Sequence, residues 1–331
     1  MALRAPLIVR RSRLAMATLA TACLLLHGQL ARGVTIAEIK EAWLKHSASF
    51  DAISYKFQQD KTEDLYTKAT NDPFAPRDPD AVKERVSLKG SLTFLRAGEK
   101  AVVTRVANSW DDRLGKPVER KQIFSFDGKQ NIGYIGSSVG RIESADSPSD
   151  SINNHVELIP LWWAHWPQER LVFHGDVQFD DVTASNELLD CGGAKCIELT
   201  VQSPKSPDSV QRIYVDPAHG FRVVRVNHFY KDVFRREVTL EYENDDVFGW
   251  KVASFKSNYF DDEGEPKFAI ESKVDECGFN PQVTERTFQV DFPVGTLVDW
   301  DGKQFKQEEN GELREVGEKE PRRATPKQGG L

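Results

Sequence analysis

Residues 236–243 read Arg-Glu-Val-Thr-Leu-Glu-Tyr-Glu, and Val238, Leu240 and Tyr242 alternate there with polar side chains. The same period-two pattern recurs in residues 86–94, 197–201 and 267–275. Such alternation is typical of antiparallel strands with one face in the core and one in water. Because strand-like runs do not alternate with helical ones, the sequence predicts a mainly β protein and argues against an α/β fold.

Turn signals separate the alternating runs. They include Asp127-Gly128, Phe248-Gly249 and Asp262-Glu263-Gly264. From these signals we expect a meander of about ten to twelve strands. The stretch 71–84 contains three prolines among charged residues and is expected to be a long exposed loop.

One amphipathic helix is expected before the strands. Thr35 and Glu38 have the spacing of a capping box, in which each side chain satisfies a free amide at the start of a helix. Ile36, Ile39 and Trp43 then recur near helical spacing. The sequence therefore predicts a helix at the beginning of the mature chain.

Residues 1–33 have the features of a secretory signal peptide. An apolar run from residue 14 to residue 26, too short to span a bilayer, precedes small residues at a cleavage site after Gly33. An alternative is lipidation at Cys23, which follows a loosely matching cleavage box. The charged region ahead of the apolar run contains four arginines, Arg4, Arg10, Arg11 and Arg13. We expect an exported protein of the periplasm or cell envelope, whose mature chain begins near Val34.

Charge argues against nucleic acid as a partner. The chain has 44 Lys and Arg against 51 Asp and Glu, a net charge of −7. Residues 1–33 contain five of the arginines and no acid, so their removal leaves 39 basic against 51 acidic residues, or −12. Binding to phosphates requires a basic face, which this composition does not favour.

The mature chain keeps three cysteines. Export permits disulfides, and Cys191 and Cys196 flank Gly192-Gly193, which allows a tight turn. We therefore expect a Cys191–Cys196 disulfide across a hairpin, with Cys277 left as a thiol. The alternative, half of a zinc site, requires a second ligand pair that the sequence does not offer.

Two further motifs are better explained as structure than as chemistry. Gly136-Ser137-Ser138-Val139-Gly140 fits the G-x-S-x-G pattern, but the polar residues that follow cannot pack as the helix of a nucleophile elbow. We expect a hairpin turn there and no serine nucleophile. His155, His165 and His174 are spaced too widely for metal ligation, so neither a metal nor another cofactor is expected.

The segment 156–167 concentrates tryptophan. It contains Trp162, Trp163 and Trp166, does not alternate, and is expected to form a short helix or apolar turn. One interpretation is a core plug over one sheet face. The other is a lid over a cavity for an apolar ligand, since a large curved sheet can enclose such a cavity. Both interpretations remain open from the sequence.

The order of elements resembles that of the LolA/LolB-like family, which includes lipoprotein carriers and RseB-like envelope sensors. A capped helix leads into residues 47–59, Ser-Ala-Ser-Phe-Asp-Ala-Ile-Ser-Tyr-Lys-Phe-Gln-Gln, similar to the family's opening helix and first strand. Residues 213–223 place an Asp216-Pro217 turn and Gly220 between two strands, as the family does. A helical segment also interrupts the strands in mid-chain. The resemblance covers roughly residues 35–292.

The resemblance implies a mainly β (α+β) fold: a large antiparallel unclosed β-barrel, or curved sheet, with an N-terminal helix and a mid-chain helical lid. The expected organisation is a signal peptide (1–33), the unclosed barrel domain (34–300), a C-terminal hairpin extension (301–316) and a disordered tail (317–331).

The resemblance also implies a function. It points to a non-catalytic, monomeric carrier that binds a lipid or lipidated protein through acyl chains, with contact to the membrane surface. The alternative is an RseB-like sensor or adaptor that binds an envelope protein. The residues expected to line the cavity and its lid are Leu88, Leu92, Phe94, Val102, Leu158, Trp162, Trp163 and Trp166.

Overall fold

The alternating runs form strands in the computed structural model, which describes residues 34–66, 83–111, 114–136, 138–153, 155–173, 177 and 179–316. The expected signal peptide, most of the Pro-rich loop and the expected tail lie outside these residues. The helices and 3-10 turns of the described chain are α2 (Ile36–Ser47), α3 (Asp150–Asn153), α4 (Ile159–His165), α5 (Pro167–Phe173), η1 (Phe179–Asp181), η2 (Pro217–His219) and η3 (Glu285–Phe288).

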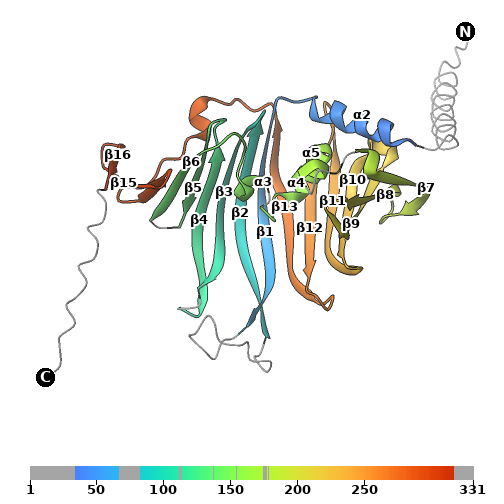
Figure 1. The fold of residues 1–331 in the computed structure, drawn as a ribbon, viewed down its shortest axis with the longest axis horizontal. Coiled ribbons are helices and arrows are strands. Elements are labelled where there is room, and N and C mark those ends of the chain that lie inside the picture. The colour runs from blue at the N-terminus through green and yellow to red at the C-terminus, as the bar shows by residue number, and fades with distance from the viewer. Residues whose placement is uncertain are drawn as a thin grey trace, which may run out of the picture. The chain divides into compact units, whose positions relative to one another are not determined.

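The strands are for the most part labelled in Figure 1. They are β1 (Ala52–Tyr66), β2 (Lys83–Ala97), β3 (Lys100–Asp111), β4 (Lys116–Phe126), β5 (Gln130–Ile135), β6 (Val139–Ser144), β7 (Val182–Asp190), β8 (Lys195–Ser203), β9 (Ser206–Asp216), β10 (Arg222–Tyr230), β11 (Val233–Asp245), β12 (Gly249–Phe260), β13 (Pro266–Phe279), β14 (Leu297–Trp300), β15 (Lys303–Gln307) and β16 (Leu313–Glu315).

These strands belong to one sheet with the order β16-β15-β14-β6-β5-β4-β3-β2-β1-β13-β12-β11-β10-β9-β8-β7. The first and last strands of this order do not pair with each other, so the sheet is unclosed, as expected. The pairings from β13 through β1 to β6, from β7 to β11 and from β14 to β16 are antiparallel, whereas β14 runs parallel to β6. The mainly β, antiparallel and unclosed fold predicted from the sequence is therefore confirmed.

The strand count was underestimated, because the described residues form sixteen strands where about ten to twelve were expected. Short strands such as β14 and β16 have too few residues to show a recognisable alternation. The C-terminal extension also begins earlier than residue 301, because β14 starts at Leu297 and pairs with β15.

The described residues divide into two compact units. Unit 1 consists of those within Met1–Ser49, Leu161–Trp250 and Tyr259–Glu265, and unit 2 of those within Phe50–Pro160, Lys251–Asn258 and Pro266–Leu331. Unit 1 contains α2, α5 and β7 to β11, and unit 2 contains α3, β1 to β6 and β13 to β16.

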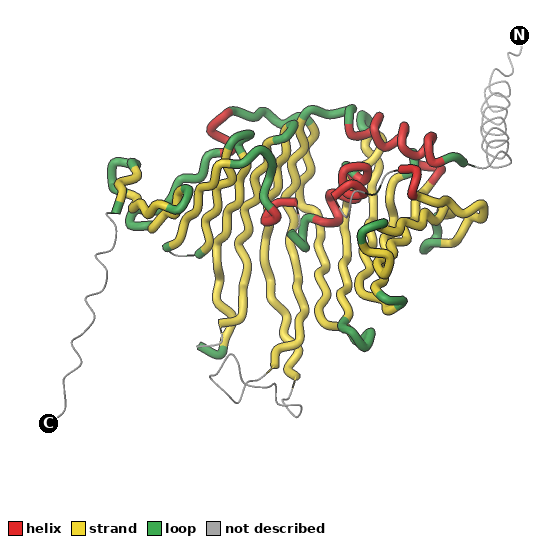
Figure 2. Tube along the Cα trace, in the orientation of Figure 1, coloured by secondary structure: helices red, strands yellow, loops and turns green. Residues whose placement is uncertain are grey.

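In unit 1, α2 begins at the predicted capping box. The Thr35 hydroxyl accepts a hydrogen bond from the Glu38 amide, while the Thr35 amide donates to the Glu38 carboxylate at 2.7 Å. Ile39 and Trp43 are buried, and Trp43 Nε1 donates to the Phe221 carbonyl at 2.7 Å. Figure 2 shows the helices of unit 1, in red, beside its strands. The amphipathic helix predicted from the sequence therefore forms and packs as expected.

The predicted Cys191–Cys196 disulfide is wrong for this structure, in which both cysteines are free thiols. The β7–β8 register pairs Leu189 with Cys196 and Asp190 with Lys195, and the Cys191 amide donates to the Ala194 carbonyl. Cys191 and Cys196 therefore lie diagonally across the hairpin. The two thiols still lie close enough for a side-chain hydrogen bond, so they are neighbours without being bonded.

The Gly136–Gly140 motif is a hairpin turn, as expected. Ile135 and Val139 pair across β5 and β6, so the chain reverses between them. Gly136 has a φ of +67°, a conformation that favours glycine. The element directly after the turn is the strand β6 and not a helix. The strand-turn-helix geometry of a nucleophile elbow is therefore not formed around Ser138.

Candidate functional site

Unit 2 carries a large apolar face on β1 to β4. The register places Phe57 opposite Leu92, and Tyr55 opposite Phe94, across β1 and β2. Phe94 in turn lies opposite Val103 of β3. Because residues directly opposite each other share a face, these side chains form one surface, here called the apolar face. Its buried members include Tyr55, Phe57, Leu88, Leu92, Phe94, Val103 and Phe126.

Val102 is the exception among the predicted cavity residues. It lies opposite Leu95 and is therefore on the reverse of the sheet, while Val103 occupies the apolar face. On that reverse face, the Ser125 hydroxyl donates to the carbonyl of Phe288 in η3 at 2.6 Å. Val102 therefore does not share the face of Leu92 and Phe94, whereas the adjacent Val103 does.

A short segment lies over the apolar face within unit 2. We call residues 155–160 the covering segment; it leads into α4 and contains the predicted site residue Leu158, which is fully buried. The His155 ring lies 6.3 Å from the ring of Phe124 on β4, centroid to centroid. Phe124 lies opposite Val103, so this contact is on the apolar face.

An ion pair attaches the covering segment to the sheet. Arg105 Nε lies 3.0 and 2.9 Å from the two carboxylate oxygens of Glu157, and Arg105 Nη1 donates to Gln122 at 3.1 Å. Arg105 lies directly opposite Leu92, so the charge sits within the apolar face. The Glu157 side chain is only 3% exposed. Removing one partner of such a buried pair typically costs about 3–5 kcal/mol, because the other charge is then left unpaired.

His155 adjoins this ion pair. Burial lowers the pKa of His155, Glu157 partly offsets that effect, and Arg105 lowers the pKa further. His155 is therefore neutral at pH 7 and contributes an uncharged ring beside the ion pair.

The predicted tryptophans lie in unit 1. The Trp162 and Trp166 rings are 5.3 Å apart, and Trp163 is fully buried in α4. The prediction of a short helix for this stretch is confirmed. All three side chains are at most 6% exposed, so each already packs inside the protein.

A histidine pair joins α2 to α4 in unit 1. His46 Nε2 lies 3.1 Å from His165 Nδ1, and the His46 ring stacks on Trp250 with centroids 4.0 Å apart. Burial lowers the pKa of His46 to about 4. Burial, with a smaller effect of His46, lowers the pKa of His165 well below its usual value. Both rings are neutral at pH 7, and their contact, between residues 119 positions apart, has no signal in the sequence.

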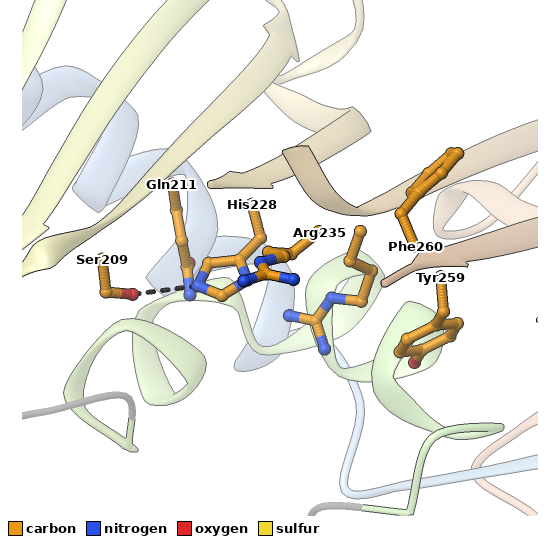
Figure 3. Close-up of a pocket in the computed structure, with 7 residues that line it drawn as sticks. Ser209, Gln211, His228, Arg235, Tyr259 and Phe260 are labelled. Atoms are coloured by element: carbon orange, nitrogen blue, oxygen red, sulfur yellow. Dashed lines mark hydrogen bonds between the residues drawn. The ribbon is translucent and has the colours of Figure 1, made fainter. Parts of the chain in front are cut away.

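Unit 1 also contains a polar pocket of about 330 Å³. Figure 3 shows Ser209 hydrogen-bonded to His228, with Tyr259 and Phe260 on the side of the pocket away from Ser209. The lining residues are Ser209, Gln211, His228, Arg235, Arg236, Tyr259 and Phe260. None of them was identified from the sequence.

Among the described residues, no group of three or more His, Cys, Asp and Glu side chains is placed to hold a metal ion. None of the described helices has the length and apolar character needed to cross a membrane.

Comparison with known proteins gives matches among solved structures alone, because no protein-family model and no curated protein matches this chain. A DUF1329 family protein from Desulfovibrio piger is 12% identical, with 76% of this chain and 96% of that chain covered, at a TM-score of 0.44.

Two further solved structures are similar to the chain. A LolA superfamily protein from Nitrosomonas europaea is 10% identical, with 76% of this chain and 97% of that one covered and a TM-score of 0.36. A putative outer membrane lipoprotein-sorting protein domain from Vibrio parahaemolyticus is 10% identical, with coverages of 78% and 97% and a TM-score of 0.34.

Proposed function

We propose that this chain is a non-catalytic carrier of the cell envelope that binds acyl chains of a lipid or lipidated protein on the apolar face of unit 2. The observation that carries the proposal is the attachment of the covering segment through Arg105 and Glu157. A stable core needs no charged pair at this place, and apolar side chains of similar volume would often be as stable or more so.

The ion pair allows the covering segment to leave the sheet as a unit. Once it leaves, Arg105 and Glu157 are hydrated again. Opening therefore costs less free energy than it would if interlocking apolar side chains joined the segment to the sheet. Opening uncovers Leu92, Phe94 and Val103, whose exposure to water is unfavourable. An acyl chain that covers them gains about 0.8 kcal/mol for each buried CH₂ group.

The tryptophans are linked to the covering segment by the chain itself. Trp162, Trp163 and Trp166 follow the covering segment directly in sequence, on α4 and at its end. Movement of residues 155–160 must therefore alter the surroundings of at least the nearest tryptophan. Tryptophan emission is accordingly the expected reporter of ligand entry, while the strand signal in far-UV circular dichroism stays unchanged.

Native mass spectrometry of the full chain, isolated from the envelope of cells that export it, tests this proposal. We expect added mass that collision removes as fatty acid or lipid, and uptake of palmitate by protein stripped of its ligand. Protein that carries no acyl chain and takes up no palmitate contradicts the carrier proposal. A retained polypeptide without an acyl group would contradict it in favour of the adaptor function.

A further inference from the structure

We infer that the pocket of unit 1 lined by His228, Arg235 and Arg236 binds a phosphate group. This site is independent of the apolar face, which lies in unit 2, and stands whether or not acyl chains bind there. Three features of the pocket indicate a phosphate ligand. Its lining has several hydrogen-bond donors and no carboxylate, and a β-bulge brings two arginines together in it.

A β-bulge places both arginines in one pocket. The hairpin of β10 and β11 turns at Lys231 and Asp232, whose φ values of 51° and 62° fit a tight two-residue turn. The register pairs Phe229 with Phe234 but His228 with Arg236, leaving Arg235 as the extra residue. In a regular strand Arg235 and Arg236 would point to opposite faces, whereas a bulge redirects one side chain.

The lining is cationic. It contains two guanidinium groups and no carboxylate. Arg235 forms an ion pair with Asp262, whose side chain is 86% exposed. Arg236 Nε, in contrast, is buried without a hydrogen-bond partner. A buried donor on a charged group without a partner is costly, and a bound oxyanion would remove that cost.

Neighbouring groups reinforce the positive potential. Arg170 of α5 is 3% exposed, and burial with the charge of Arg236 lowers its pKa to about 10. Burial, Arg236 and Arg235 lower the pKa of His228 to about 4, so it is a neutral donor or acceptor at pH 7. Its Nε2 lies 2.9 Å from the Ser209 hydroxyl, which can rotate toward a ligand.

The surroundings fit a phosphate ester as well as the free ion. The residues beside the pocket on the same sheet face are apolar. Two positions along the strands from Gln211, His228 and Arg236 lie Ile213, Val226 and Val238, respectively. Ile213 pairs with Val226, and Val226 pairs with Val238. Phe260 also lines the pocket. Planar guanidinium groups bind phosphate oxygens in pairs, which makes arginine the suitable residue here. The phosphate could belong to inorganic phosphate or to a phospholipid headgroup.

Isothermal titration calorimetry of the full chain with inorganic phosphate, and separately with monomeric dihexanoyl phosphatidic acid, tests the site. We expect wild type to bind, and Arg236→Gln to weaken binding at least tenfold. Arg235→Gln, at a partly exposed side chain, should also weaken binding and serves if Arg236→Gln does not fold. Tighter binding of phosphatidic acid than of phosphate identifies a headgroup, and equal binding identifies free phosphate.

Arg212→Gln is the matched control. Arg212 is adjacent to Gln211 on β9 but on the other face, where it is exposed and lies over the ring of Phe229. We expect it to bind both ligands as wild type does. The inference is overturned if neither ligand binds wild type at 10 mM, or if the Arg235, Arg236 and Arg212 variants bind equally well.

Discussion

Arg105 and Glu157, 52 residues apart in sequence, form an ion pair with both carboxylate oxygens within 3.0 Å of one guanidinium nitrogen. The pair joins the middle of β3 to the covering segment, and Arg105 stands opposite Leu92 on the apolar face. Since Glu157 is almost completely buried and Arg105 is 14% exposed, separation of this segment from the sheet requires breaking the pair.

Arg105→Gln should speed ligand exchange. Without the guanidinium, Glu157 favours water over its buried place, so the covering segment opens more often and stability falls by about 3 kcal/mol. The release rate of a fluorescent palmitate analogue, measured by stopped flow, should rise several-fold. Arg120→Gln is the matched control, because Arg120 pairs with Asp111 between β3 and β4. Equal release rates in the two variants would exclude a role for the ion pair in opening.

Acidification should destabilise the protein through His46 and His165. The folded pKa of His46 is about 4, whereas an unfolded histidine has a pKa near 6.5. Between these values the unfolded state binds more protons, so stability is fully present above pH 6.5 and falls as the pH decreases. Urea unfolding between pH 7 and pH 5 should show a loss of about 1 kcal/mol per pH unit for each histidine.

A variant of the histidine pair isolates this effect. His46→Gln removes one titrating ring, so the decline of stability with acid should become shallower, whatever its stability at pH 7. A pH dependence identical in wild type and His46→Gln would show that the buried pair does not titrate as described.

The cysteines should differ in reactivity. Burial, with a smaller effect of Cys191, raises the pKa of the Cys196 thiol to about 12, so it is not a thiolate at pH 8. Iodoacetamide on the folded protein should modify the half-buried Cys191 and leave Cys196 intact, and in urea both should react. Peptide mapping of untreated protein that finds a bond between Cys191 and Cys196 would contradict the free thiols of this structure.

Gly90→Ala should destabilise the sheet. A Cβ at Gly90 would collide with the Ala107 side chain and lie 3.0 Å from the Ala107 Cα, where β2 and β3 approach closely. We expect a loss of about 1–3 kcal/mol in chemical denaturation, and recovery in Gly90→Ala/Ala107→Gly. Gly133→Ala is the control, since its Cβ would meet Phe124 at an ordinary 3.6 Å. Equal stabilities of the two single variants would contradict this packing.

The local sequence pattern correctly predicted the features that depend only on residues close together in the chain. The capping box at Thr35 and Glu38 and the alternation of Val238 and Leu240 each lie within a few positions, and both formed as expected. The sequence also predicted correctly that Ser138 lies in a hairpin turn. The polar residues after it could not form a packed helix, and the strand β6 follows instead.

Features that depend on the register between strands could not be predicted from the sequence. Val102 and Val103 are equivalent in sequence, and only the pairing of Phe94 with Val103 decides which one faces the apolar side. Cys191 and Cys196 have suitable spacing, but their register makes them diagonal neighbours. Arg235 and Arg236 share a pocket because of a bulge that has no sequence signature here.

Photolabelling tests the carrier proposal most directly. Full-length protein is loaded with a palmitate that carries a diazirine in mid-chain, irradiated, digested and mapped by mass spectrometry. We predict labels on peptides of β1 to β3 and of residues 155–160, with competition by unlabelled palmitate, and more rapid labelling in Arg105→Gln. Labels that avoid the apolar face, or that unlabelled palmitate does not displace, would contradict the proposal that acyl chains bind beneath the covering segment.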